Sequence, residues 1–110
     1  MAGTLEVSPQ DAQRRLNSGS ATLIDVRERE EFALARIDGA RLVSMQEIPA
    51  ELQKLQELAS ETELLLICHH GVRSLQAAQW LREQGLENCF SVTGGIDRWS
   101  REIDPSVAIY

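Results

Sequence analysis

Leu64-Leu65-Leu66-Ile67-Cys68-His69-His70-Gly71-Val72-Arg73-Ser74 joins a run of four large apolar residues to a short polar loop. Such a run is typical of a strand that is buried on both faces, as in the middle of a parallel sheet. A helical pattern follows from Ser74 to Gln84, and its apolar face consists of Ala77, Ala78, Trp80 and Leu81. Cys68 is therefore predicted to lie where a buried strand ends and a loop leads into a helix.

The predicted position of Cys68 favours a reactive thiolate. Backbone N–H groups at the start of a helix point into the preceding loop, and the helix dipole adds partial positive charge there. Arg73 adds a full positive charge to the same region. Because the thiolate is the nucleophilic form of cysteine and positive surroundings favour it, the stretch predicts an anion-binding loop with a sulfur nucleophile.

Length and charge limit the class of protein. The chain has 110 residues and a formal net charge of −6, which fits one small domain and argues against nucleic acid and anionic membranes as partners. No apolar run reaches the length of about 18 residues that a membrane span needs, and residues 1–4 show no signal-peptide pattern, so we expect a cytoplasmic protein. Two cysteines in such a chain are expected to be free thiols.

The acidic residues are unevenly spread along the chain. No carboxylate occurs between Glu63 and Glu83, the segment that contains Cys68, both histidines and Arg73. One interpretation is a locally positive site that attracts anions. The other is that a buried strand and a partly buried helix lack carboxylates in any case. The sequence leaves both interpretations open.

The remaining patterns alternate strands with helices. Strands are predicted at residues 4–7, 22–26, 40–43, 64–67 and 88–92. Helical segments are predicted at residues 8–17, 28–33, 44–59 and 74–84, and from 96 until Pro105 ends the last one. This alternation predicts an α/β fold with a doubly wound, mainly parallel sheet and helices on both faces. Asp25 and Arg27 then lie beyond the carboxyl end of a strand, on the same side as Cys68.

Four segments also occur in the order and spacing of a known family: Asp25-Val26-Arg27, Arg36-Ile37-Asp38-Gly39-Ala40, Cys68-His69-His70-Gly71-Val72-Arg73-Ser74 and Gly94-Gly95-Ile96-Asp97-Arg98-Trp99. From about Leu5 to Asp104 the chain resembles a single-domain rhodanese, a thiosulfate sulfurtransferase-like protein. The resemblance implies one domain over residues 1–110, with a short C-terminal tail and a catalytic Cys68. One segment departs from the family pattern, because Ala35-Arg36-Ile37-Asp38-Gly39-Ala40 stands where members often carry Gly-His-Ile-Pro-Gly-Ala.

The resemblance implies a sulfurtransferase whose Cys68 carries a persulfide held by the loop of His69, His70, Gly71, Val72 and Arg73. The donor would be a small anionic sulfur compound such as thiosulfate, and the acceptor cyanide, a thiol or a protein cysteine. Arg73 is expected to bind the donor or to favour the thiolate, and each histidine either donates to the substrate or faces solvent. No cofactor is expected. No metal site is expected either, since Cys68, His69 and His70 are neighbours on one tight loop and seldom converge on one ion.

The roles of Asp25, Arg27 and Cys89 and one alternative function remain to be considered. Asp25 and Arg27 are either an ordinary ion pair at a strand end or a brace for the cysteine loop, and the resemblance favours the brace for Arg27. Cys89 lies in an apolar strand pattern and is predicted to be a small buried hydrophobic residue. A regulatory, non-catalytic binding module is an alternative function for a rhodanese-like domain.

A Cys-dependent phosphatase or arsenate reductase is the remaining alternative, because those enzymes also close a cysteine loop with arginine at a helix N-terminus. They use five residues between the cysteine and the arginine, and this chain has the four from His69 to Val72. The shorter loop favours enclosure of a sulfur atom over a tetrahedral oxyanion.

Overall fold

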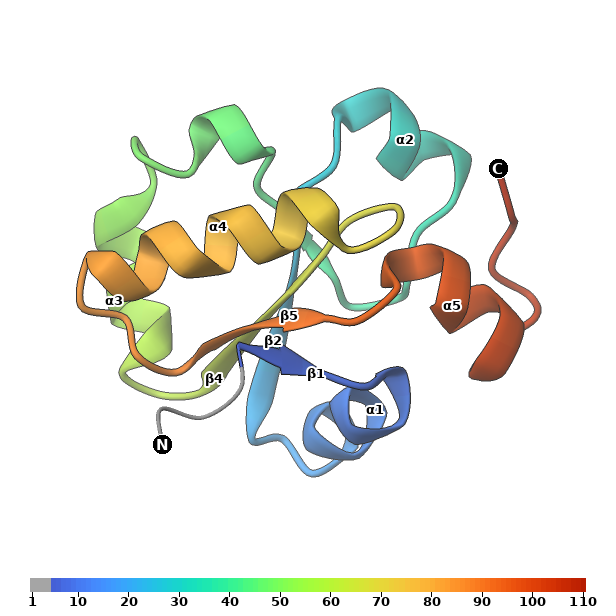
Figure 1. The fold of residues 1–110 in the computed structure, drawn as a ribbon, viewed down its shortest axis with the longest axis horizontal. Coiled ribbons are helices and arrows are strands. Elements are labelled where there is room, and N and C mark those ends of the chain that lie inside the picture. The colour runs from blue at the N-terminus through green and yellow to red at the C-terminus, as the bar shows by residue number, and fades with distance from the viewer. Residues whose placement is uncertain (1–4) are drawn as a thin grey trace.

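A computed structural model describes residues 5–110 of the chain, and these residues form a five-stranded sheet flanked by helices (Figure 1). The strands lie in the order β1-β5-β4-β2-β3, and every pairing is parallel. Their bounds are Glu6–Val7 for β1, Ala21–Asp25 for β2, Arg41–Leu42 for β3, Glu63–Ile67 for β4 and Cys89–Val92 for β5. The predicted α/β fold with a parallel sheet is confirmed.

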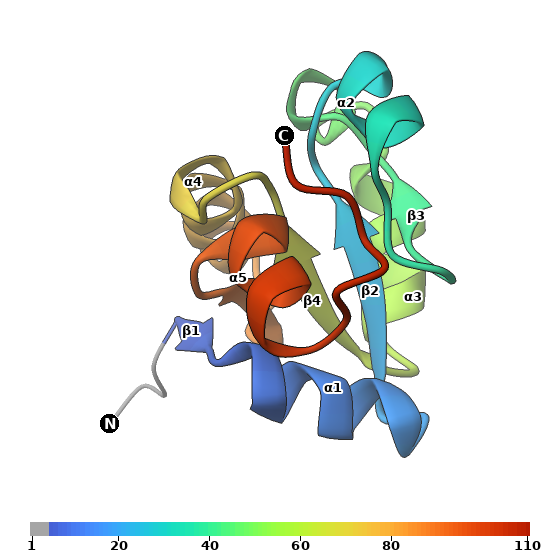
Figure 2. The same ribbon diagram turned by 90° about the vertical axis from the view of Figure 1, so that its right-hand side faces the viewer.

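Helices cover both faces of the sheet. Their bounds are Pro9–Asn17 for α1, Arg29–Leu34 for α2, Leu52–Ala59 for α3, Val72–Glu83 for α4 and Gly95–Glu102 for α5. Buried residues of α3 and α4 share one hydrophobic core with the sheet, and buried residues of α1 and α5 share the other. Figure 2 looks onto the face that α1 and α5 cover. None of the helices formed by residues 5–110 is long and apolar enough to cross a membrane.

The apolar run before Cys68 forms β4, the middle strand of the sheet. It pairs with β2 on one side and with β5 on the other, and Leu64 to Ile67 are fully buried. Alternate residues of β4 point into the two cores, which explains why the run is apolar throughout. Asp25 lies opposite Ile67 in the register, so the end of β2 lies beside the start of the Cys68 loop.

Most predicted helix starts are confirmed, and one predicted helix is interrupted. Ser8 caps α1 by accepting a hydrogen bond from the Asp11 amide at 3.1 Å. The capping box of Ser44 and Glu47 is also present, but it starts only a short 3-10 helix, Met45–Glu47, before α3 begins at Leu52. Pro49 accounts for the interruption, because proline has no N–H to continue the helical ladder. Of the predicted strand at residues 4–7, residue 4 lies outside the described residues.

Helix α4 begins two residues earlier than the sequence pattern predicts, at Val72 instead of Ser74. The residue before it, Gly71, has φ of 105°, a backbone conformation that glycine adopts readily and other residues rarely. This turn brings the chain from β4 directly into the helix. The Cys68 loop is therefore short, and the first amides of α4 lie close to the sulfur.

Candidate active site

The Cys68 sulfur lies in a small cradle of hydrogen-bond donors at the end of β4. Its Sγ accepts hydrogen bonds from the Gly71 amide at 3.0 Å and the Ser74 amide at 3.3 Å. The residue is 1% exposed and is a free thiol, as predicted. Ser74 stands in the first turn of α4, so its amide is one of those that a helix leaves without an intrahelical partner. The cradle therefore points two backbone amide donors at the sulfur.

Two serine hydroxyls extend this cradle below the sulfur. Ser74 Oγ lies 3.4 Å from Cys68 Sγ and 2.7 Å from the Oγ of Ser91 on β5. Both serines are fully buried. When the sulfur is a thiolate, Ser74 can donate to it while accepting from Ser91, which adds a third donor. Ser91 was not predicted from the sequence, because its hydroxyl reaches the site through the pairing of β5 with β4 and not through proximity in the chain.

Helix α5 fixes the outer side of the loop through backbone hydrogen bonds. The Ile96 amide donates to the Cys68 carbonyl at 2.8 Å, and the Asp97 amide donates to the His69 carbonyl at 3.1 Å. Gly95 allows this close approach, because a Cβ at that position would lie 2.5 Å from the His69 carbonyl oxygen. The Gly94-Gly95 turn thus places the N-terminus of α5 directly against the cysteine loop.

Arg73 is held by a carboxylate from α2. Its Nη1 and Nη2 donate to the two carboxylate oxygens of Glu31 at 2.6 and 2.9 Å, and its side chain is 34% exposed. The hydrogen bonds from Arg73 lower the pKa of Glu31 to about 2, against the opposing effect of burial. The same pairing raises the pKa of Arg73, with a smaller contribution from the charge of Cys68. The carboxylate-free stretch of sequence did not reveal this partner, which comes from another helix.

The Glu31–Arg73 pair should make the free energy of unfolding depend on pH in the acidic range. A carboxylate with a lowered pKa in the folded state contributes stability above its unfolded pKa of 4.5, and the contribution is lost as the pH falls through about 2. We expect Glu31→Gln to lower the free energy of unfolding by roughly 1–2 kcal/mol at pH 6, after allowance for solvent screening.

Urea unfolding of both proteins between pH 6 and pH 2 checks this prediction. The difference between wild type and Glu31→Gln should shrink towards zero as the pH falls. A difference that stays constant over this range would show that the charge of Glu31 does not contribute.

Asp25 and Arg27 form a fully buried ion pair beside the loop. Arg27 Nη2 donates to Asp25 Oδ2 at 2.7 Å, and the two side chains are 0% and 1% exposed. Arg27 Nε also donates to both Asp25 carboxylate oxygens, at 2.9 and 3.1 Å, and the remaining side-chain hydrogen bonds of Arg27 go to the carbonyls of Glu31 and Ala35 and to the Tyr110 hydroxyl. Burial opposes the charge of Arg27, but its bonds to Asp25 and Tyr110 outweigh this and raise its pKa. The pair thus reaches the loop through α2 and Tyr110, and within residues 5–110 no hydrogen bond joins it to Cys68.

Removal of Arg27 should be strongly destabilising. Arg27→Met leaves the Asp25 carboxylate buried without its partner, so we expect the free energy of unfolding to fall by about 3–5 kcal/mol. Arg98→Met is the matched control, because Arg98 pairs with Glu102 at a partly exposed site and its loss should cost less than about 1 kcal/mol. Equal losses in the two variants, measured by urea unfolding, would contradict the structural role given to Arg27.

Tyr110 closes one side of the site, and no sequence pattern predicted this role. Its ring stacks on His69 with centroids 3.9 Å apart and an interplanar angle of 7°. Its hydroxyl donates to Glu31 Oε2 at 2.8 Å, and its main-chain oxygen lies 2.9 Å from His69 Nε2. Figure 2 shows the tail after α5 ending between α2 and the loop before α4. The predicted short tail therefore packs over the cysteine loop.

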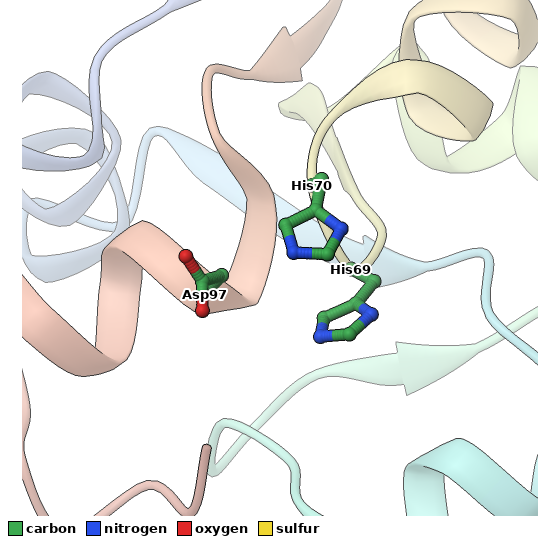
Figure 3. Close-up of side chains that lie close together, drawn as sticks. All are labelled: His69, His70 and Asp97. Atoms are coloured by element: carbon green, nitrogen blue, oxygen red, sulfur yellow. The ribbon is translucent and has the colours of Figure 1, made fainter. Parts of the chain in front are cut away.

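The remaining predicted residues take different positions. His70 stacks on His69 with centroids 3.9 Å apart and is exposed, and Figure 3 shows both rings on the same side of the loop. Val72 is 65% exposed at the start of α4. Cys89 is 0% exposed in β5, and burial raises the pKa of its thiol to about 12, so the prediction of a buried residue is confirmed.

Comparison with known proteins identifies the family of the chain. The family model of the rhodanese-like domain matches residues 8–102. The thiosulfate sulfurtransferase GlpE of Haemophilus influenzae is 37% identical over 97 residues, which are 87% of this chain and 88% of that protein. A chloroplastic rhodanese-like/PpiC domain-containing protein 12 of Arabidopsis thaliana is 34% identical over 91 residues, or 82% of this chain, and the match spans 30% of that longer protein.

Among solved structures, a human single-domain sulfurtransferase, TSTD1, superposes with a TM-score of 0.80 at 32% sequence identity. The match covers 91% of this chain and 98% of the human one. The resemblance stated from the four sequence segments is confirmed. The chain belongs to the rhodanese-like domain family, and its relatives include proteins named as sulfurtransferases.

Proposed function

We propose that the protein is a sulfurtransferase that moves a sulfane sulfur from a small anionic donor to a nucleophilic acceptor through a persulfide on Cys68. The observation that carries this proposal is the cradle around the sulfur, in which the amides of Gly71 and Ser74 donate to Cys68 Sγ. Preorganised donors of this kind stabilise a charged sulfur without rearranging during the reaction.

The transfer takes two displacement steps. The Cys68 thiolate attacks the outer sulfur of thiosulfate, the S–S bond of the donor breaks, and sulfite leaves with the bonding electron pair. The enzyme then holds a cysteine persulfide, a covalent intermediate. An acceptor such as cyanide, a small thiol or a protein cysteine attacks the outer sulfur, and Cys68 leaves as the thiolate. Each step exchanges only sulfur between nucleophiles, so no cofactor is needed.

Arg73 supplies positive charge near the sulfur while remaining paired with Glu31. The pairing fixes the guanidinium, and the charge of Cys68 contributes to the raised pKa of Arg73, which supports electrostatic proximity of the two groups. A donor anion therefore meets an oriented but partly neutralised arginine, and the backbone amides provide the rest of the anion binding. Donors that carry a compact charge next to the sulfane sulfur fit this arrangement.

Paired assays test the proposal against its alternatives. The protein should form thiocyanate from thiosulfate and cyanide and should not hydrolyse an aryl phosphate, since four residues separate Cys68 from Arg73. Turnover of the phosphate without thiocyanate formation would support a phosphatase. Absence of both activities in folded protein would support a binding module.

A further inference from the structure

Three potential metal ligands, two from the cysteine loop and one from α5, converge outside the cradle that holds the sulfur. One ligand atom each from His69, His70 and Asp97 lie within 4.8 Å of one another (Figure 3). The two imidazoles come from the loop after β4, and the carboxylate comes from the first turn of α5. Figure 3 shows the imidazole rings and the carboxylate facing the same space.

The backbone holds these ligands in fixed relative positions. The Asp97 amide donates to the carbonyl of His69 itself at 3.1 Å, and the neighbouring Ile96 amide donates to the Cys68 carbonyl at 2.8 Å. The helix turn that carries the carboxylate is thus hydrogen-bonded to the loop that carries the imidazoles. The three side chains then need to adjust to share an ion, and Tyr110 has to adjust with them, because its ring stacks on His69 and its main-chain oxygen lies 2.9 Å from His69 Nε2.

The present spacing of the ligand atoms is near the spacing that a shared ion requires. Zinc binds nitrogen and oxygen ligands at about 2.0–2.2 Å, which separates tetrahedral ligand atoms by roughly 3.4 Å. His70 is exposed, and His69 and Asp97 are half-buried, so the side chains have room to close the remaining distance. Asp97 accepts hydrogen bonds from Arg101 at 3.2 and 3.3 Å, which are longer than those between Arg73 and Glu31. This pairing is the main cause of the lowered pKa of Asp97. The carboxylate is held by a partner that is itself largely exposed.

We propose that His69, His70 and Asp97 form a binding site for a divalent transition-metal ion of the zinc class, next to the Cys68 loop. Two imidazoles and one carboxylate are a ligand set that suits such ions better than it suits magnesium or calcium, which take oxygen ligands. The site stands on this geometry and does not depend on the proposed sulfur transfer. If the protein is a sulfurtransferase, a bound ion ties the loop to α5 and slows the transfer.

Zinc titration of the Cys68→Ser protein tests the site without interference from the reactive thiolate. Isothermal calorimetry should show one zinc ion bound per chain. Asp97→Asn in the same background should weaken binding at least tenfold, because it removes the only anionic ligand. Arg101→Ala should strengthen binding, because it frees Asp97 from its present partner. The last variant alters an exposed side chain on α5 and has the opposite expected sign, so a general loss of folding cannot imitate it.

Two results would overturn the proposal. One is the absence of zinc binding to the folded Cys68→Ser protein at concentrations up to about 1 mM, a range that includes weak sites. The other is equal zinc affinity of the Cys68→Ser protein and its Asp97→Asn and Arg101→Ala derivatives, which would place the bound ion elsewhere. As a second readout, zinc should inhibit wild-type thiocyanate formation at lower concentration than it inhibits Asp97→Asn, each compared with its own metal-free rate.

Discussion

Cys68→Ser should reduce sulfur transfer on the order of a thousandfold or more while leaving the fold intact. A serine hydroxyl is far less acidic than a thiol and far less nucleophilic towards sulfur. The first displacement therefore cannot occur, and no persulfide forms. Serine is nearly isosteric with cysteine and can still accept the hydrogen bonds that the Gly71 and Ser74 amides donate. Thiocyanate formation and urea unfolding, measured on the same protein, separate loss of chemistry from loss of structure.

Cys89→Ala is the matched control for this experiment. Cys89 is fully buried in β5, and burial raises the pKa of its thiol to about 12, so it is inert as a nucleophile at neutral pH. The variant should keep its transfer rate and lose only a little stability. Near wild-type transfer in Cys68→Ser would refute the mechanism, and loss of transfer in a stable Cys89→Ala protein would require a relay between two cysteines.

Gly95→Ala should lower transfer about 10- to 100-fold, because a displacement of the loop by about 1 Å is enough for losses of this size. The added Cβ would collide with the main-chain oxygens of Cys68 and His69, so the loop or the start of α5 has to move. Two backbone hydrogen bonds that join α5 to the loop, from Ile96 and Asp97, should weaken at the same time. The thiocyanate assay measures the effect, and unfolding measurements show how much structure is retained.

Gly85→Ala separates this collision from the general cost of replacing glycine. Gly85 has φ of 98° and Gly95 has φ of 62°, so alanine is strained at both positions, by about 1–2 kcal/mol. A Cβ at Gly85 would meet nothing within 4 Å. Gly85→Ala should therefore lose stability but keep its transfer rate. If both variants transfer sulfur at the wild-type rate, the close packing of α5 does not position the loop.

The sequence predicted the centre of the site because the signals there are local. The segment from Glu63 to Glu83 contains a run of four apolar residues, then a glycine, then a helical pattern. Together they place Cys68 at the end of a buried strand. The ion pair of Asp25 and Arg27 was likewise placed beside this edge because parallel strands end together. Such inferences need only the periodicity of each element and the order of the strands.

The surroundings of the loop could not be predicted, because they come from distant segments. Glu31 meets Arg73 across 42 positions of the chain, and Tyr110 meets His69 across 41. Both contacts depend on how α2 and the tail pack, which no local pattern encodes. The expectation of no metal site considered Cys68 with the two histidines, whereas the third potential ligand, Asp97, belongs to α5.

The persulfide on Cys68 is the central claim, and the intact mass of the protein tests it most directly. After incubation with thiosulfate and removal of the excess, mass spectrometry should show wild type heavier by the mass of one sulfur atom. Added cyanide should return the protein to its original mass, and Cys68→Ser should show no addition. An unchanged wild-type mass, or the same addition on Cys68→Ser, would contradict the proposed mechanism.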